Sequence, residues 1–241
     1  MWPLTRGRYR ARLGESAGDV LAAQALRHLA FHGSEGLDQD AFDLRCQHLL
    51  VENDQNQLVA CCRLQVFGAQ DDLQASYSAQ SYDLTRLARF AGPKLELGRF
   101  CLKPGVKDPN ILRLIWGALT VILDGHGVTL LFGCTSFAGA DPALHTAALA
   151  TLPNHTAPLE YAPAPRALER VALPAGQGDS LGLPALLRSY LAMGAWVSDH
   201  AVIDRAMNTL HVLTALPVAQ VPQARARALR AIGAGNSTAG D

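Results

Sequence analysis

The stretch Leu95–Leu123 reads LELGRFCLKPGVKDPNILRLIWGALTVIL, and it decides the fold class of this chain. Leu95–Leu102 has the composition of a strand, which the prolines and glycine of residues 104–109 end. Apolar residues then recur at helical spacing over 110–122, so we predict an amphipathic helix there. The segment VTLLFGC, residues 128–134, follows as a buried strand. Strand, helix and strand in this order are typical of an α/β sheet.

Elements on both sides of this stretch extend the prediction. Ser16-Ala17-Gly18-Asp19 matches a capping box and predicts a helix over 17–31. The other expected elements are, in chain order, an acidic loop at 32–44, strands at 48–52 and 58–67, a short helix at 84–90, a helix over 142–152, a helix over 185–193, and strands at 196–203 and 210–216. The Pro-rich segment 153–184 predicts a long loop, and the Ala- and Arg-rich tail from residue 221 is expected to fray. We therefore expect a single α/β (α+β) domain over 1–241, a mixed central sheet with helices on both faces.

The charges balance overall but are sorted along the chain. Lys plus Arg and Asp plus Glu number 21 each, and a net charge of zero argues against a nucleic-acid-binding protein. Residues 35–54 are acidic, and the segment 94–113 is rich in Lys and Arg. One hypothesis is a pocket wall for a cationic substrate and a surface for an anionic partner; the alternative is solvated faces of alternating sign.

The cysteine pattern and the apolar runs indicate a cytoplasmic protein. The five cysteines form no CxxC pair, so we predict no metal site and no thioredoxin motif, and expect reduced thiols. The N-terminus lacks the apolar core of a signal peptide. The longest apolar run, Leu114–Leu123, is far shorter than the ~20 residues that span a bilayer.

Familiar catalytic motifs are missing. The chain has no GxGxxG, P-loop or HExxH motif. Gly-Cys-Thr-Ser-Phe is not a nucleophile elbow, because Phe137 and Ala138 follow Ser136. Cys134 and His145 would suit a Cys-His hydrolase, but a cysteine that ends a buried strand is more often a core residue.

Charged residues within apolar elements are the better candidates. Glu96 and Arg99 lie three residues apart in one strand, and a buried charge must pair or serve a ligand. They would point to opposite faces of a regular strand, whereas a bulge at Gly98 would turn both toward one cleft. A structural ion pair is the alternative. A mixed sheet could gather six charged residues around that cleft: Arg27, Asp40, Asp43, Arg63, Glu96 and Arg99.

Four segments in combination carry a resemblance. They are FDLRCQHLLV, LELGRFCL, GCTSFAGADPALH and YLAMGAWVSDHAVIDR. Together they resemble the L-ornithine Nα-acyltransferases of bacterial ornithine-lipid synthesis, a GNAT-like group related to the acyl-homoserine-lactone synthases. The resemblance covers roughly residues 8–220. ExxRF alone is a weak signal, but ExxRF followed by GCxSFxGxDPxxH is specific.

The resemblance implies transfer of a 3-hydroxyacyl chain from acyl carrier protein to the α-amine of ornithine or a similar amino acid, giving lyso-ornithine lipid. Glu96 would accept the amine proton and Arg99 would order the cleft, as the catalytic pair. The expected substrate-binding residues are Arg27, Asp40, Asp43, Arg63, Ser136, Asp141 and His145. Acyl carrier protein is acidic, so the expected docking residues are Lys94, Lys103, Lys107 and Arg113.

The sequence also indicates which molecule donates the acyl group. The usual GNAT pyrophosphate loop is absent after Leu102, where the chain reads KPGVKDPNILR. We therefore expect no bound cofactor and an acyl-phosphopantetheine supplied by the carrier protein. Because the product is a lipid, one hypothesis is that the Arg-rich N-terminus or the RARALR tail contacts the inner membrane peripherally; the default interpretation is that these arginines are solvated.

Two segments depart from the family pattern and bear on the amine that is accepted. The segment after Arg27, LAFHGSEGLDQD, is short, and His211 stands where an acidic residue is expected. The alternatives are an acyl-homoserine-lactone-type synthase that uses S-adenosylmethionine and a non-catalytic module that binds acyl carrier protein or lipid. The intact ExxR pair argues against the second.

Overall fold

The computed structural model describes residues 2–234, which fall into two compact units. Unit 1 comprises the described residues of Met1–Val66, Leu97–Gly127 and Gln223–Asp241, and unit 2 comprises Phe67–Glu96 and Val128–Pro222. Strand β6 (Lys94–Leu102) contributes to both units, because the boundary falls between Glu96 and Leu97. The units interleave along the sequence, which explains why composition shows no linker between them.

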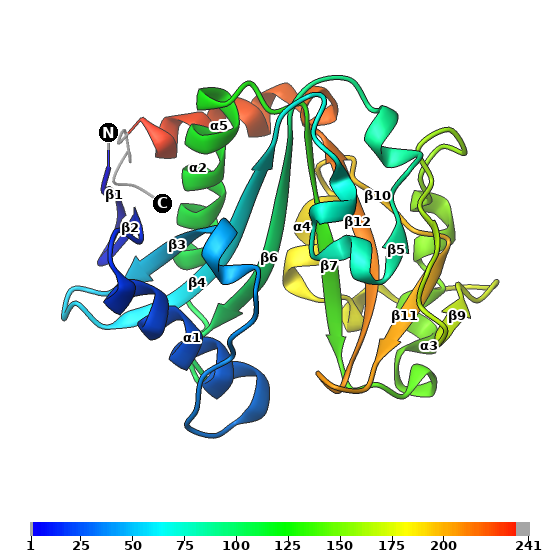
Figure 1. The fold of residues 1–241 in the computed structure, drawn as a ribbon, viewed down its shortest axis with the longest axis horizontal. Helices are drawn as coiled ribbons and strands as arrows, with labels where there is room; N and C mark the ends of the chain where they lie inside the picture. Colours follow the sequence, from blue (N-terminus) through cyan, green and yellow to red (C-terminus); the bar gives the residue numbers. More distant parts are fainter. Residues whose placement is uncertain (1, 235–241) are drawn as a thin grey trace. The chain divides into compact units, whose positions relative to one another are not determined.

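Unit 1 is built on a sheet with strand order β1-β2-β3-β4-β6, in which β1 to β4 pair antiparallel. Its strands are β1 (Leu4–Arg6), β2 (Tyr9–Leu13), β3 (Gln47–Glu52), β4 (Leu58–Phe67) and the second half of β6. Its helices are α1 (Ala17–His32), α2 (Pro109–Gly125) and α5 (Gln223–Gly233), and Figure 1 shows α5 lying across α2.

Helices cover both faces of this sheet. Ala23 and Leu26 of α1 pack on Leu50, Cys61 and Cys101, which share one face. Side chains alternate between faces along a strand, so the neighbours of Leu50 in β3 point the other way, and they too are fully buried. Helix α2, which contacts β1, β2 and β3, covers that second face.

The predicted start of α1 is confirmed in atomic detail. Ser16 is the N-cap, its hydroxyl accepts from the Asp19 backbone N–H, and the Asp19 carboxylate accepts from the Ser16 N–H. Asp19 also binds Arg12 of β2 at 2.6 Å. One carboxylate therefore both caps the helix and fastens it to the sheet.

Both chain ends are more ordered than the sequence suggested. The Arg-rich N-terminus forms the hairpin β1–β2, whose Arg10 and Arg12 bind Glu52 at 2.7 and 2.9 Å. The tail from 221, expected to fray, instead forms α5; residues 235–241 lie outside the described residues. The reason is contact with α2, where Arg230 forms two hydrogen bonds with Asp124.

Unit 2 has a mixed sheet. The start of β6 pairs in parallel with β7 (Leu130–Ala138), and the order continues antiparallel through β12 (Thr209–Pro217), β11 (His200–Asp204) and β9 (Arg170–Ala172). Strand β10 (Trp196–Val197) also pairs with β12, and β5 (Tyr82–Asp83) pairs with β8 (Ala164–Pro165). The helices are α3 (Thr146–Leu149) and α4 (Ala185–Leu191).

The two faces of the unit 2 sheet have separate cores. On one face, Phe132 and Leu213 pack under Leu73, Tyr82 and further residues of the irregular segment 67–90. On the other face, β7 and β12 residues pack under α3 and α4. The Pro-rich segment therefore does not run as one loop, because β8 and β9 pair with other strands.

The predicted α/β fold class is confirmed by the mixed strand pairing and the helices that pack on the strands. The strand expected at 128–134 runs instead over Leu130–Ala138, because β12 pairs with its full length. Within residues 2–234 no helix combines the length and the apolar composition needed to cross a bilayer.

Candidate active site

Three arginines and three aspartates form a buried network in unit 1. Arg27 of α1, Arg63 of β4 and Arg99 of β6 meet the carboxylates of the loop that follows α1. Six ion pairs of 2.5 to 3.5 Å connect them: Arg27 to Asp38 and Asp43, Arg63 to Asp40 and Asp43, and Arg99 to Asp38 and Asp40. Five of the six charged residues singled out in the sequence therefore come together.

The most buried part of the network is the Arg27–Asp43 pair. Arg27 is 1% exposed and donates two hydrogen bonds of 2.8 Å to the Asp43 carboxylate. Burial opposes ionisation of Asp43, but hydrogen bonds from Arg27 and Gln24 outweigh burial and hold the pKa of Asp43 well below its usual value. Both groups stay charged, so the pair fixes the loop against α1.

Sequence reasoning missed two members of the network. Asp38 bridges Arg27 and Arg99, at 2.8 and 3.1 Å, and Gln24 donates to Asp43 at 2.9 Å. Two features of the sequence could have suggested these residues. Asp38 lies two residues before Asp40 in the acidic loop, and Gln24 lies three residues before Arg27, on the same face of the helix. Neither signal tells which residue the folded loop will meet.

The backbone of β6 departs from a regular strand at Arg99. Arg99 has a φ of 51°, in the left-handed region, whereas the sequence placed the irregularity at Gly98. A non-glycine residue in this conformation is held there by its surroundings. The two ion pairs of the Arg99 side chain supply that constraint.

Glu96 belongs to unit 2, where two backbone N–H groups bind its carboxylate. It is 4% exposed, and its two carboxylate oxygens accept backbone N–H groups of Tyr77 at 3.0 Å and Ser78 at 2.7 Å. Ser78 begins a short 3₁₀ helix, Ser78–Gln80, so Glu96 neutralises the partial positive charge at its start. The carboxylate is thus fixed in place by main-chain donors.

The motif GCTSFAGADPALH spans the end of β7 and the turn after it. Cys134 is half-buried, and its thiol donates to the Ser78 hydroxyl at 3.6 Å, on the Glu96 side of the strand. The His145 ring instead packs on Phe137, which points to the opposite face. This separation does not support a Cys134–His145 hydrolase.

The other members of this motif shape the turn. Ser136 is exposed on β7. Asp141 accepts the Ala143 N–H at 3.0 Å and caps the 3₁₀ helix that follows, and His145 Nε2 lies 3.0 Å from the Gly139 carbonyl oxygen. These contacts order the loop, and the roles of the three residues toward a substrate stay predictions.

One expected docking residue is misplaced. Lys94 is 1% exposed and donates to the Gly92 carbonyl at 2.9 Å, so it presents no charge at the surface. The sequence could not reveal this, because the residue opens a strand that packs on both sides. Of the remaining three, all in unit 1, Lys103 is half-buried, and Lys107 and Arg113 are exposed.

The N-terminal arginines join the remaining basic residues. Arg6 of β1 donates to Asn110 in the first turn of α2 at 3.1 Å, and Arg113 lies three residues further along the same helix. Two basic stretches that are distant in sequence thus meet at the start of α2.

His211 of β12 is buried among apolar and aromatic groups. The Tyr82 hydroxyl donates to its carbonyl at 2.9 Å and lies 3.2 Å from its Nδ1. Burial lowers the pKa of His211 to about 4. Within residues 2–234 no three His, Cys, Asp or Glu side chains are grouped so that they could hold a metal ion.

Comparison with known proteins agrees with this geometry. A family model described as an acetyltransferase (GNAT) domain matches residues 26–117, which include the whole arginine–aspartate network. The apo crystal structure of TofI aligns over 92% of this chain and 98% of its own, with a TM-score of 0.51 and 14% identity, a likeness of fold.

Curated relatives match over most of their length. The L-ornithine Nα-acyltransferase of Brucella abortus (strain 2308) is 30% identical over 250 aligned positions, covering 89% of this chain and 86% of the relative. The protein of the same name from Rhodobacter capsulatus is 31% identical, covering 85% and 88%.

Proposed function

Since the chain belongs to the L-ornithine Nα-acyltransferases and is an N-acyltransferase, we propose that it moves a 3-hydroxyacyl chain from acyl carrier protein to the α-amine of ornithine. The observation that supports this most is the buried Glu96 carboxylate, held by two main-chain donors. The product would be lyso-ornithine lipid.

Glu96 is the proposed general base. It takes one proton from the substrate ammonium and passes it to solvent, and the neutral nitrogen attacks the thioester carbonyl carbon. The next proton on nitrogen leaves with the pantetheine thiolate when the carbon–sulfur bond breaks. The backbone N–H groups of Tyr77 and Ser78 hold this carboxylate in a fixed position. General-base help of this kind contributes roughly 10² to 10⁴ in rate.

The arginine–aspartate network is the proposed site for the charged amino acid. Asp40 has the most exposed side chain of the three carboxylates, at 24%, and its 3.5 Å contact with Arg99 is the longest in the network. The side-chain ammonium of ornithine, which is not the reacting amine, can therefore join Asp40 while Arg63 stays bound to it. Asp43 and Arg27 position the loop, and Arg99 holds the carboxylates of Asp38 and Asp40.

The remaining predicted residues belong to the same proposal. Ser136 offers an exposed hydroxyl, and Asp141 and His145 hold the turn beside it. The donor is an acyl-phosphopantetheine delivered by acyl carrier protein, without a resident cofactor. The acidic surface of the carrier protein docks on Lys103, Lys107 and Arg113. Arg6 belongs to the same surface, because its hydrogen bond to Asn110 places it at the start of α2.

A two-acceptor assay tests the proposal. Purified protein receives 3-hydroxyacyl carrier protein with either ornithine or S-adenosylmethionine, and products are followed by mass spectrometry. We expect an Nα-acyl-ornithine in the first reaction. An acyl-homoserine lactone in the second would identify a lactone synthase, and carrier-protein binding without any product would identify a non-catalytic module.

The place of action follows from the product. Lyso-ornithine lipid is amphipathic, so a cytoplasmic enzyme in peripheral contact with the inner membrane can pass it directly to the bilayer. Sedimentation with vesicles in the presence of product is the measurement; protein that stays in the supernatant would contradict membrane contact.

A further inference from the structure

A pocket lies within unit 2, at the edge of its sheet where β9 pairs with β11. It encloses about 410 Å³ and is lined by Pro165, Leu168, Arg170, Ala172, Asp199 and His200. A volume of this size suits a small ligand. None of the residues assigned to acyl transfer lines it.

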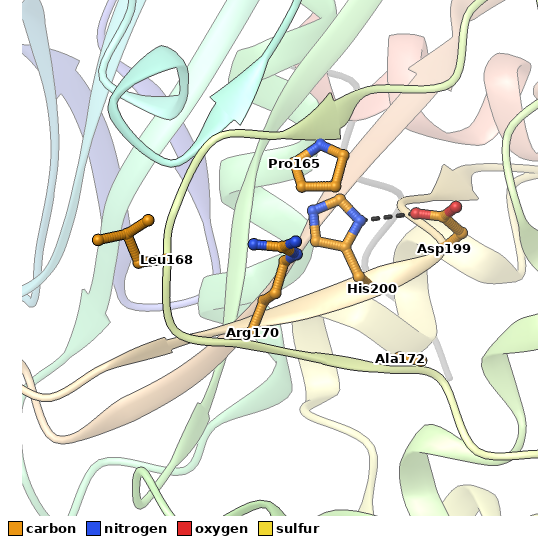
Figure 2. Close-up of a pocket in the computed structure, with 6 residues that line it drawn as sticks. All are labelled: Pro165, Leu168, Arg170, Ala172, Asp199 and His200. Carbon is orange, nitrogen blue, oxygen red and sulfur yellow. Dashed lines mark hydrogen bonds and ion pairs between the residues drawn. The ribbon is translucent and has the colours of Figure 1, made fainter.

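The pocket contains a buried nitrogen without a partner. His200 is 5% exposed, and its Nδ1 is bound to the Asp199 carboxylate at 2.6 Å. Within residues 2–234, its Nε2 has no hydrogen-bond partner. Figure 2 shows this nitrogen on the side of the ring away from Asp199, toward Pro165 and the Arg170 guanidinium. A buried polar atom of this kind requires a ligand or water.

The imidazole is held rigidly. Its ring packs on Tyr82 with centroids 5.2 Å apart, and the Ser198 hydroxyl donates to the His200 carbonyl at 2.7 Å. The hydrogen bond to Asp199 places a proton on Nδ1, which leaves Nε2 as an acceptor in the neutral ring.

Arg170 supplies positive charge to the same pocket. It pairs across the sheet with Val202, and His200 pairs with Ala172, so Arg170 and His200 are diagonal neighbours on one face. Its Nη1 donates to the Ala167 carbonyl at 3.0 Å, which uses one of the five N–H groups of the guanidinium.

From this arrangement we propose that the pocket binds a phosphate monoester or free phosphate. A monoanionic phosphate has a hydroxyl that donates to His200 Nε2 and charged oxygens that accept from Arg170. A carboxylate lacks the donor, and a phosphodiester lacks it too. Leu168, which is 93% exposed, lies at the rim of the pocket, and Pro165 lies beside the His200 ring. An apolar group esterified to the phosphate would contact these two side chains.

Calorimetric titration with inorganic phosphate at about pH 7, where the neutral imidazole and the phosphate monoanion are both present, tests the site without reference to acyl transfer. Saturable binding is expected. Arg170→Ala and His200→Phe, which keeps an aromatic ring against Tyr82, should each weaken it about tenfold or more. Arg188→Ala, at an exposed position of α4, is the matched control and should bind as the wild type does.

Vesicles distinguish the source of the phosphate. Sedimentation with phosphatidic acid vesicles, competed by inorganic phosphate, would identify a lipid headgroup. Binding of phosphate without vesicle binding would identify a soluble ligand. Absence of both, equally tight binding of acetate, or unchanged binding in Arg170→Ala would overturn the proposal. Arg170 is exposed, so Arg170→Ala should fold normally. This variant therefore tests the phosphate site even if His200→Phe fails to fold.

Discussion

At the scale of single residues, buried charges in this protein are held by matched partners. Asp43 is bound by Arg27, Arg63 and Gln24, and Glu96 is bound by two main-chain N–H groups. Removing one partner of a buried ionic group leaves the other uncompensated, which typically costs 3–5 kcal/mol. Changes at these positions must therefore keep the shape of the side chain if function is to be separated from folding.

Glu96→Gln is the decisive substitution for the proposed base. The amide keeps the size of the side chain and can still accept the Ser78 N–H, but it loses the hydrogen bond from the Tyr77 N–H, so the protein should fold with a melting temperature lower by several degrees. Because an amide cannot take a proton, kcat for acyl transfer should fall about 10² to 10⁴-fold. Exposed Glu160→Gln in the same unit is the control, and an unchanged kcat in Glu96→Gln would remove Glu96 as the base.

His211 makes stability depend on pH. Its pKa is lowered by burial to about 4, from an unfolded value near 6.5. The unfolded chain therefore binds the proton first, and stability present above about pH 6.5 is lost as pH falls toward 4, by about 3 kcal/mol. His48, whose pKa burial also lowers, adds to the loss. Urea unfolding at pH 7 and at pH 4.5 measures this loss of unfolding free energy. The loss should be smaller in His211→Asn and unchanged in the control His126→Asn, since His126 is exposed.

At the scale of elements, the α2–α5 contact depends on the absence of a side chain at Gly117. A Cβ there would lie 2.4 Å from Ile232 Cγ2 and 2.8 Å from Ile232 Cβ. Ile232 is β-branched and cannot easily turn away. This packing explains why an Ala- and Arg-rich tail, which the sequence alone suggested would fray, is helical.

Gly117→Ala should therefore loosen α5. We expect faster proteolysis after residue 222 and a melting temperature lower by several degrees. Gly125→Ala in the same helix is the matched control, because no atom lies within 4 Å of a Cβ at that position. It should be neutral or slightly stabilising. Equal behaviour of the two variants would contradict the packing account.

Helices with a strong local sequence pattern could be predicted. Elements that become ordered only through contacts with residues distant in the sequence could not. Helix α1 was predictable from its capping box, and α2 from its apolar period and terminal prolines and glycines. The hairpin β1–β2 and helix α5 were missed, since their arginine-rich sequences become ordered through Glu52 and Asp124. Local composition cannot show such distant partners.

At the scale of the whole molecule, opposite charges are gathered in particular places rather than spread evenly along the chain. The acidic loop meets three arginines inside unit 1, and the basic residues gather at the start of α2. The pairing of Asp40, Asp43 and Arg27 could be suspected from sequence, because charges in apolar elements need partners. The burial of Lys94 and the two interleaved units could not, since both depend on long-range packing.

The proposed docking surface predicts a charge-reversal effect. Lys107→Glu with Arg113→Glu should raise KM for acyl carrier protein about tenfold or more, with kcat little changed, because the acidic partner is repelled before chemistry. High salt should weaken the wild-type interaction in the same way. Arg188→Glu on α4 is the control, and an unchanged KM in the double variant would place docking elsewhere.

The central claim is that this chain acylates the α-amine of ornithine. The most direct measurement is lipid mass spectrometry of a host without ornithine lipids that expresses the chain. We expect a new lyso-lipid composed of ornithine and one 3-hydroxyacyl chain, which Glu96→Gln abolishes. Soluble protein without any new lipid, or a lipid built on a different amine, would contradict it.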